Sequence, residues 1–286
     1  MATNTTPTVR IFAPELWGEI DLFRNFYSGT HLFGRDTQKA LSGIGNHFNK
    51  AIILRDLAVK MAPNLELDRA ELETRGFTPA MNSKEFSAVI EAIFLELYSS
   101  VDCARKIVSF IYRQCRRMPD STRKLFQRVC NNELGSDFPM ELKQAISSAT
   151  WYRELLAIRD ELTHSDIGSC YLDRETNRIS YSHQGIQYGG ASLEIEDVLP
   201  KIEEFISGIN EYLGSVFHFL NSQLRPHTVD QLCGIFFGRA YLRKIELEMP
   251  INFNSGICQS RGWFDSTPGY RCPFVESCGA YDRAST

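Results

Sequence analysis

One segment of this chain carries apolar residues at helical spacing over a long distance. Between Ser83 and about Met118 they recur every three or four positions, at Val89, Ile93, Leu97, Val101, Ile107, Phe110 and Ile111. This period places apolar side chains along one side of a helix, which other elements must then cover. Ser83 is the expected N-cap. Pro119 is expected to end the helix, because the residue before a proline disfavours helical backbone angles.

Further segments show helical periodicity or short strand patterns. We expect helices over about 14–27, 37–62, 121–131, 140–163 and 194–224. The last of these is expected to begin near Val198, because Pro200 is tolerated only in a first turn. We expect two short strands at 170–172 and 178–182 and a charged loop at 64–79. Residues 228–248 are ambiguous and could form a helix followed by a strand at about 240–247.

These elements predict a mainly all-α fold, in which an antiparallel helical bundle carries a small inserted β-hairpin and an irregular C-terminal extension. The two long helices, at 83–118 and 194–224, precede and follow the 140–163 helix and the hairpin in the chain. We expect an N-terminal helical region at 1–82, a helical domain at 83–225 and an extension with a Cys-bearing tail at 226–286.

Composition limits the location and the partners of the protein. Its 43% hydrophobic and 23% charged residues are ordinary for a globular chain. No stretch approaches the roughly 20 apolar residues of a membrane helix, and residues 1–10 lack the apolar centre of an export signal. Eight cysteines without such a signal indicate reduced thiols, hence a cytoplasmic protein without a membrane partner. Because the net charge is −4, attraction to RNA requires a local basic patch.

The strongest chemical signal is the sequence RDELTH, which runs from Arg159 to His164 near the end of the 140–163 helix. Arginine binds phosphate with a fork of N–H donors. Histidine transfers protons near neutral pH. Similar arginine-to-histidine spacings occur at 24–31, where a glycine disfavours a helix, and at 178–183, which reads as a strand. The Arg159 copy is therefore the candidate for a metal-free site that cleaves phosphodiesters.

A helical wheel at about 100° per residue separates the faces of this segment. The core stripe consists of Trp151, Leu155, Ile158 and Leu162. One flank, away from that stripe, carries the polar residues Arg159, Asp160, Thr163 and His164. Asp160 and His164 are four positions apart and so can touch. A carboxylate in that position would favour the protonated imidazole and orient it.

The same flank has simpler interpretations. Arginine and aspartate on a helix often form only a solvated face, and a histidine in the last turn often complements the helix dipole. Tyr152 and Leu156 also fall on this flank. A mixture of aromatic, apolar and charged residues is typical of a contact surface such as a dimer interface.

The segment from Trp151 to His164 resembles the signature of the HEPN superfamily, which is an arginine, a polar residue and a histidine near the end of a helix in an all-α bundle. The order of helix, motif helix, hairpin and closing helix extends the resemblance over about residues 83–225. The resemblance implies a metal-independent endoribonuclease without a cofactor, in which two copies form one RNA cleft around a two-fold axis. Arg159 would hold the scissile phosphate. His164 would transfer a proton as the ribose 2′-OH attacks to give a 2′,3′-cyclic phosphate, and Asp160 would orient the pair.

The resemblance also implies a role in a prokaryotic defence, toxin or stress system, with a protein antitoxin or regulator as partner. In relatives controlled by a nucleotidyltransferase the motif often continues as H-x-Y, whereas His164 is followed by Ser165 and Asp166, so we do not expect that control here. The alternative is a non-catalytic HEPN-type module that binds RNA, nucleotide or protein. A third possibility is an unrelated helical scaffold.

A group of cations surrounds Pro119, against a single acid, Asp120. The candidate RNA-binding residues are Arg113, Arg116, Arg117, Arg123 and Lys124, and the group also includes Arg105, Lys106 and Arg128. Clustered cations bind the RNA backbone because neutralising phosphates dominates such binding. A solvated turn between helices explains the same cluster equally well.

We expect no metal site. Cys258, Cys272 and Cys278 with Cys233 or His227 would supply four zinc ligands, but paired C-x-x-C spacing is absent, which favours free thiols in a loose tail. Residues 262–271 mix aromatics and cations, which either stack on bases or pin the tail. Phosphate-loop, dinucleotide-binding, HExxH and GxSxG motifs are absent.

Overall fold

A computed structural model describes residues 9–10, 18–164, 167–173, 175–188, 191–248, 251–252 and 254–284. The chain divides into two compact units. Residues Phe33–Phe219 form the helical unit, and Met1–Leu32 with Leu220–Thr286 form the terminal unit. The division at residues 82 and 225 stays a sequence-based prediction.

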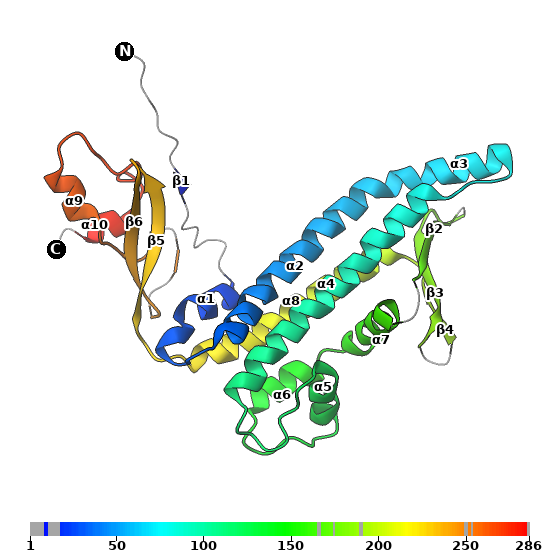
Figure 1. The fold of residues 1–286 in the computed structure, drawn as a ribbon, viewed down its shortest axis with the longest axis horizontal. Coiled ribbons are helices and arrows are strands. Elements are labelled where there is room, and N and C mark those ends of the chain that lie inside the picture. Colours follow the sequence, from blue (N-terminus) through cyan, green and yellow to red (C-terminus); the bar gives the residue numbers. More distant parts are fainter. Residues whose placement is uncertain are drawn as a thin grey trace, which may run out of the picture. The chain divides into compact units, whose positions relative to one another are not determined.

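The helical unit consists mainly of helices (Figure 1). They are α2 (Arg35–Met61), α3 (Leu65–Arg75), α4 (Met81–Ile111), α5 (Thr122–Cys130), α6 (Met140–Ser147), α7 (Tyr152–His164) and α8 (Val198–Ser222). The long ones are α2, α4 and α8. α2 packs along α4, and α7 packs against α4 and β3. The core contains the edge-on contact of Phe94 in α4 with Phe205 in α8, whose ring centroids are 5.9 Å apart.

A three-stranded antiparallel sheet lies beside α4 and α7. Its strands β2 (Ser169–Leu172), β3 (Ile179–Tyr188) and β4 (Ala191–Ile195) follow the order β2-β3-β4. Tyr181 in β3 is buried and packs edge-on against Phe94, with ring centroids 5.7 Å apart. The two predicted strands are present, but β3 is longer than expected and β4 adds a third strand.

The terminal unit contains a second antiparallel sheet, in the order β1-β5-β6-β7. Its elements are β1 (Val9–Arg10), α1 (Glu19–Phe26), β5 (Thr228–Phe236), β6 (Arg239–Glu246), β7 (Ile257–Cys258), α9 (Arg261–Ser266) and α10 (Gly279–Arg283). Phe237 and Gly238 join β5 to β6 with φ angles of 52° and 70°. Two successive positive φ angles are typical of the tight turns that match the twist of a hairpin.

The prediction of a mainly all-α fold is wrong, because the chain is a mixed α/β protein with two antiparallel sheets. The segment 228–248, whose structure the sequence leaves ambiguous, forms the β5–β6 hairpin. In β6 the inward positions are Tyr241, Arg243 and Ile245, and all three side chains are buried. An arginine at an inward position hides the apolar alternation that identifies a strand.

One helix prediction and one loop prediction also fail for local reasons. The expected helix at 140–163 is broken between α6 and α7, where the backbone N–H groups of Ala149 and Tyr152 bond to carbonyls three residues back, those of Ile146 and Ala149, and so end the α-helical ladder. The expected charged loop at 64–79 instead contains α3. Burial of Leu65 and an ion pair between Glu71 and Arg75 at i,i+4 stabilise that helix.

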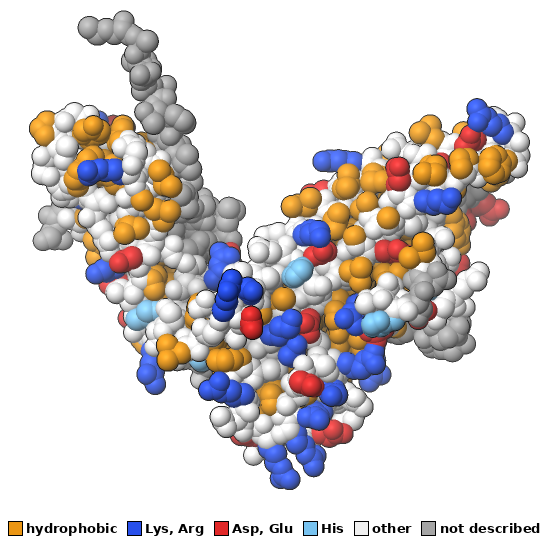
Figure 2. Space-filling model, viewed as in Figure 1, with side chains coloured by type: hydrophobic (Ala, Val, Ile, Leu, Met, Phe, Trp, Pro, Cys, Tyr) orange, Lys and Arg blue, Asp and Glu red, His pale blue; other side chains and the backbone are white. Residues whose placement is uncertain are grey.

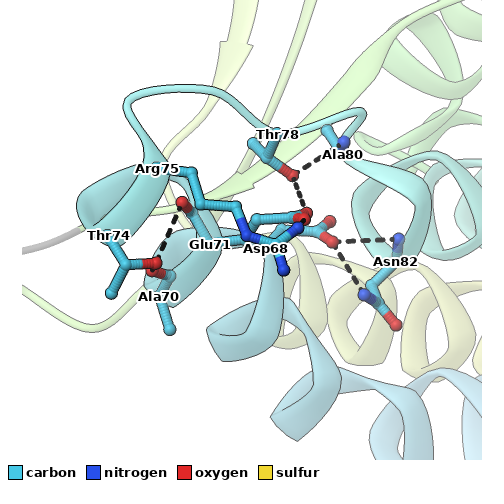
Figure 3. A network of polar contacts seen from close by, with 8 residues as sticks. All are labelled: Asp68, Ala70, Glu71, Thr74, Arg75, Thr78, Ala80 and Asn82. Carbon is cyan, nitrogen blue, oxygen red and sulfur yellow. Dashed lines mark hydrogen bonds and ion pairs between the residues drawn. The ribbon is translucent and has the colours of Figure 1, made fainter.

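A buried carboxylate, Asp68 of α3, caps the start of α4 (Figure 3). It accepts hydrogen bonds from the Asn82 amide side chain at 2.7 Å and from the Ser83 backbone N–H at 2.7 Å. α4 begins at Met81, after Ala80 in a left-handed conformation, so Ser83 is not its N-cap. Ser83 donates its hydroxyl to Asp68 at 2.9 Å instead. The residue that caps α4 is therefore Asp68 of the preceding helix, and not a residue at the start of α4 itself.

The start of α5 has a side-chain N-cap, Ser121. The Ser121 hydroxyl accepts the Lys124 backbone N–H at 3.3 Å. We predict that Ser121→Ala lowers the free energy of unfolding by about 1 kcal/mol, because an orphan N–H of the first turn loses its acceptor. Chemical denaturation measures this, with Ser136→Ala in an exposed turn as the control. Equal stabilities of the two variants would contradict the assigned cap.

Candidate functional site

The buried face of α7 holds the motif in place. Leu155 and Ile158 are fully buried, and Trp151, just before the helix, packs edge-on against Tyr212 of α8 at 6.0 Å between ring centroids. Leu162 is only half-buried. Burial of the first three residues confirms most of the predicted core stripe, and it directs the arginine and the histidine of the motif away from the core.

Tyr152 lies in the core, which corrects its predicted place on an exposed flank. Its ring stacks on Phe126 of α5 at 3.6 Å and lies 6.3 Å from Tyr98 of α4. Burial raises the pKa of Tyr152, followed by the effect of the neighbouring Tyr98 hydroxyl, so the phenol stays neutral at physiological pH. These three rings form a layer under the polar residues of the motif.

Arg159 is held from two sides and stays accessible. Its guanidinium carbon lies 4.8 Å from the centre of the Tyr98 ring, a cation–π distance, and its Nη1 donates to Asp160 at 2.9 Å. The side chain is 34% exposed. Because these contacts restrict the guanidinium without covering it, Arg159 offers donors to an anion at low entropic cost.

Asp160 joins two arginines. Besides Arg159 it forms an ion pair with Arg123 of α5, and its side chain is 25% exposed. No ion pair between Asp160 and His164 is present in the part of the chain that the structure describes. The carboxylate therefore orients the guanidinium groups of Arg159 and Arg123, rather than the imidazole.

His164 is the last residue of α7, and its side chain is exposed. The preceding Thr163 donates its hydroxyl to the Arg159 carbonyl at 2.7 Å, which keeps the final turn helical. His164 lies five positions after Arg159, which is about one and a half turns of helix. The imidazole is thus open to a ligand or to a second chain.

The predicted basic cluster is divided by ion pairs. Arg105 and Lys106 pair with Asp102, and Lys124 pairs with Asp120. Burial raises the pKa of Asp102, but hydrogen bonds, first from Thr122 and then from Lys106, lower it by more, so its pKa lies below the usual value. These pairs leave less free positive charge than the sequence indicates.

The other candidate cations follow α4. Arg113, Arg116 and Arg117 are exposed, and Figure 2 shows lysine and arginine side chains gathered over the end of the helical unit that holds α5 and α6. Of the predicted RNA-binding residues, Arg123 is the one that an ion pair connects to the motif. The sequence indicates Arg123 only by its charge, and the fold places it against Asp160.

Next to the motif lies a cavity of about 510 Å³. Its lining includes Arg123, Phe126, Tyr152, Arg153 and Leu156, from α5 and α7. The sequence alone does not predict this cavity, because its walls come from segments that are separated along the chain. The one hint in the sequence is Leu156, an apolar residue that falls on the polar flank of the helical wheel.

The cysteine candidates lie in the terminal unit. Cys258, Cys272 and Cys278 line one small cavity together with Cys233. His227 instead contacts the Arg225 carbonyl at 2.9 Å. Within the described residues, no three His, Cys, Asp or Glu side chains are arranged to hold a metal ion.

Comparisons with protein-family models, with curated proteins and with solved structures find no match to this chain. The resemblance to the HEPN superfamily therefore rests on the sequence motif and its order of elements alone, and it stays a prediction. None of the helices described is long and apolar enough to cross a membrane.

Proposed function

We propose that the protein is a metal-independent endoribonuclease of the HEPN type. The observation that carries this proposal is the partly exposed Arg159 guanidinium, which is fixed against Tyr98 and Asp160 on the same helix as an exposed His164. An anion-binding fork with a proton-transfer group is sufficient for intramolecular transesterification of RNA. A defence, toxin or stress system is the proposed context, with a protein antitoxin or regulator as partner.

The proposed step transfers a phosphoryl group within the RNA. The ribose 2′-oxygen forms a bond to the adjacent phosphorus, and the bond from phosphorus to the 5′-oxygen of the next nucleotide breaks. The products are a 2′,3′-cyclic phosphate and a 5′-hydroxyl. Arg159 neutralises the charge that develops on the phosphoryl oxygens. His164 accepts the 2′-OH proton, and an acid must supply a proton to the leaving 5′-oxygen.

A homodimer supplies that acid most simply. If two copies meet near the exposed ends of α7, one His164 accepts the proton and the other donates one. A second copy would also complete an RNA cleft that Arg159 alone leaves open. Light scattering of the purified protein tests this, and a strictly monomeric nuclease would exclude the two-histidine scheme.

The decisive experiment is incubation of purified protein with total RNA in EDTA, beside Arg159→Ala. Cleavage that gives cyclic-phosphate ends and that the variant loses is the expected result. Arg178→Ala is the matched control, because Arg178 and His183 repeat the arginine–histidine spacing outside α7. Absence of cleavage, or equal cleavage by all three proteins, contradicts the proposal.

The 510 Å³ cavity favours a second candidate, a non-catalytic module that binds nucleotide or RNA. Arg123 and Arg153 offer cations to a phosphate, and the half-buried Leu156 offers apolar surface to a base. If the protein is such a module, nucleotide or RNA should bind to it without being cleaved. Arg153→Ala should weaken that binding. Cleavage that requires Arg159 distinguishes the nuclease from this module.

The exposed arginines after α4 yield a separate prediction. Arg116→Ala combined with Arg117→Ala should weaken RNA binding at low salt and reduce the slope of log affinity against log salt by about 1.4, since each phosphate contact on single strands contributes about 0.7. Fluorescence anisotropy at several salt concentrations measures this. Lys39→Ala with Lys60→Ala, two exposed lysines of α2, is the charge-matched control. Equal slopes in both double variants would refute the predicted RNA contact.

A further inference from the structure

Four cysteines from separate segments of the terminal unit face one enclosed space. Cys233 lies on β5, Cys258 ends β7, Cys272 follows α9 and Cys278 precedes α10. All four line a cavity of about 10 Å³. In sequence they are spread over 46 positions, but the fold gathers four sulfur-bearing side chains around a space the size of one ion.

A β-bulge places the first of these cysteines. The pairing of β5 with β6 runs from Leu232–Leu242 to Gly234–Tyr241, so Cys233 is the extra residue in β5. Bulges redirect a side chain that regular pairing would point elsewhere, and they are frequent next to functional sites.

A buried arginine supports the cluster. Arg243 of β6 is 1% exposed, and its Nη2 donates to the Cys233 sulfur at 3.1 Å and to the Cys278 sulfur at 3.5 Å. Its Nη1 donates to the Ser255 carbonyl at 2.9 Å. Arginine stays charged in proteins. N–H donors of this kind stabilise metal-bound thiolates and fix their orientation.

The surrounding module is small and irregular. α9 and α10 have six and five residues, and β7 has two. Its core is a short set of side chains in which Phe236, Tyr241, Phe264 and Tyr281 are the large members. Modules of this kind usually need a disulfide or a metal to stay folded. All eight cysteines are free thiols, so no disulfide stabilises this module. A bound metal ion is the remaining way to stabilise it.

We propose that these four cysteines, with Arg243 as a hydrogen-bonding support, bind one zinc ion as a tetrathiolate. Four thiolates select zinc or an iron–sulfur cluster. The small cavity favours a single ion over a multi-iron cluster. The assignment is independent of the proposed nuclease, whose residues lie in the helical unit.

Metal binding requires the thiols to converge and to lose their protons. As the side chains stand, the described residues form no ready-made metal site, so the sulfurs must rotate inward to about 2.3 Å from the ion. Burial raises the pKa of Cys272 to about 11 and also raises that of Cys258. Zinc displaces these protons, so its affinity should fall as the pH falls.

The test is metal analysis of the full-length protein, purified under reducing conditions without chelator. We expect about one zinc per chain in the wild type, and its loss in Cys272→Ser and in Cys278→Ser. Cys130→Ser, which changes the exposed cysteine that ends α5, should keep the zinc. Zinc retained by the first two variants, or iron in place of zinc, overturns the assignment.

A measurement on the wild type alone covers the case in which these variants fail to fold. The metal-free protein is titrated with Co²⁺, and thiolate-to-cobalt charge-transfer and tetrahedral d–d absorption bands should appear and saturate at about one equivalent. Zn²⁺ should then displace the cobalt and abolish the bands. Absence of these bands, or oxidation of the four thiols to disulfides with no metal bound, contradicts the proposal.

Discussion

Replacing His164 by alanine is expected to lower the rate of metal-independent RNA cleavage by about 10²–10⁴-fold, the range for loss of a positioned acid or base. Because the side chain is exposed at the end of α7, its removal leaves no cavity in the core. Folding and RNA affinity should therefore change little. Single-turnover cleavage of a labelled RNA in EDTA measures the effect.

His218→Ala is the matched control for this prediction, because His218 is also exposed and lies on α8 of the same unit. Added imidazole provides a second readout. If His164 transfers a proton, small imidazoles should restore part of the activity of His164→Ala, which a structural role would not allow. A His164→Ala protein with wild-type cleavage rates would remove the histidine from the mechanism and favour the binding module.

Local patterns were sufficient for much of the helical unit. The apolar period of α2 and α8 predicted those helices with small errors at their ends, because such a period depends on neighbours in sequence. The sequence also placed the motif near the end of a helix. α7 begins later than expected because the backbone N–H groups of Ala149 and Tyr152 bond to carbonyls three residues back, which ends the α-helical ladder after α6.

Interactions between segments that are distant in sequence could not be predicted from the sequence alone. Arg123 and Asp160 meet only because α5 packs near α7, and Arg243 becomes an interior residue only once β5 and β6 pair. Cysteine spacing without C-x-x-C pairs indicated free thiols in a loose tail, whereas the structure places four cysteines around one cavity. Each case needs a long-range contact that no local period encodes.

Asp68→Ala is expected to lower the free energy of unfolding by about 2–4 kcal/mol, because hydrogen bonds to a buried charged group contribute more than neutral ones. The carboxylate is 7% exposed and accepts the backbone N–H groups of Asn82 at 3.4 Å and Ser83 at 2.7 Å. Without it, these donors at the start of α4 lose their acceptor. Urea unfolding measures the change, and Glu73→Ala, at an exposed acid of the same helix, should have a much smaller effect.

The same carboxylate makes a pH-dependent contribution of known sign. Burial raises the pKa of Asp68, but the hydrogen bonds from Asn82 and Ser83 together lower it by more, so its pKa in the folded protein lies below the usual 3.8. Stability from a depressed carboxyl pKa is fully present above the unfolded pKa of about 3.9 and is lost as the pH falls through the folded value. The stability difference between wild type and Asp68→Ala should therefore be constant near neutral pH and shrink in acid. Asp68→Asn, which keeps one acceptor oxygen but no titrating group, should lose stability by less than Asp68→Ala at neutral pH. A wild-type advantage that persists undiminished in acid would show that the carboxylate acts by packing alone.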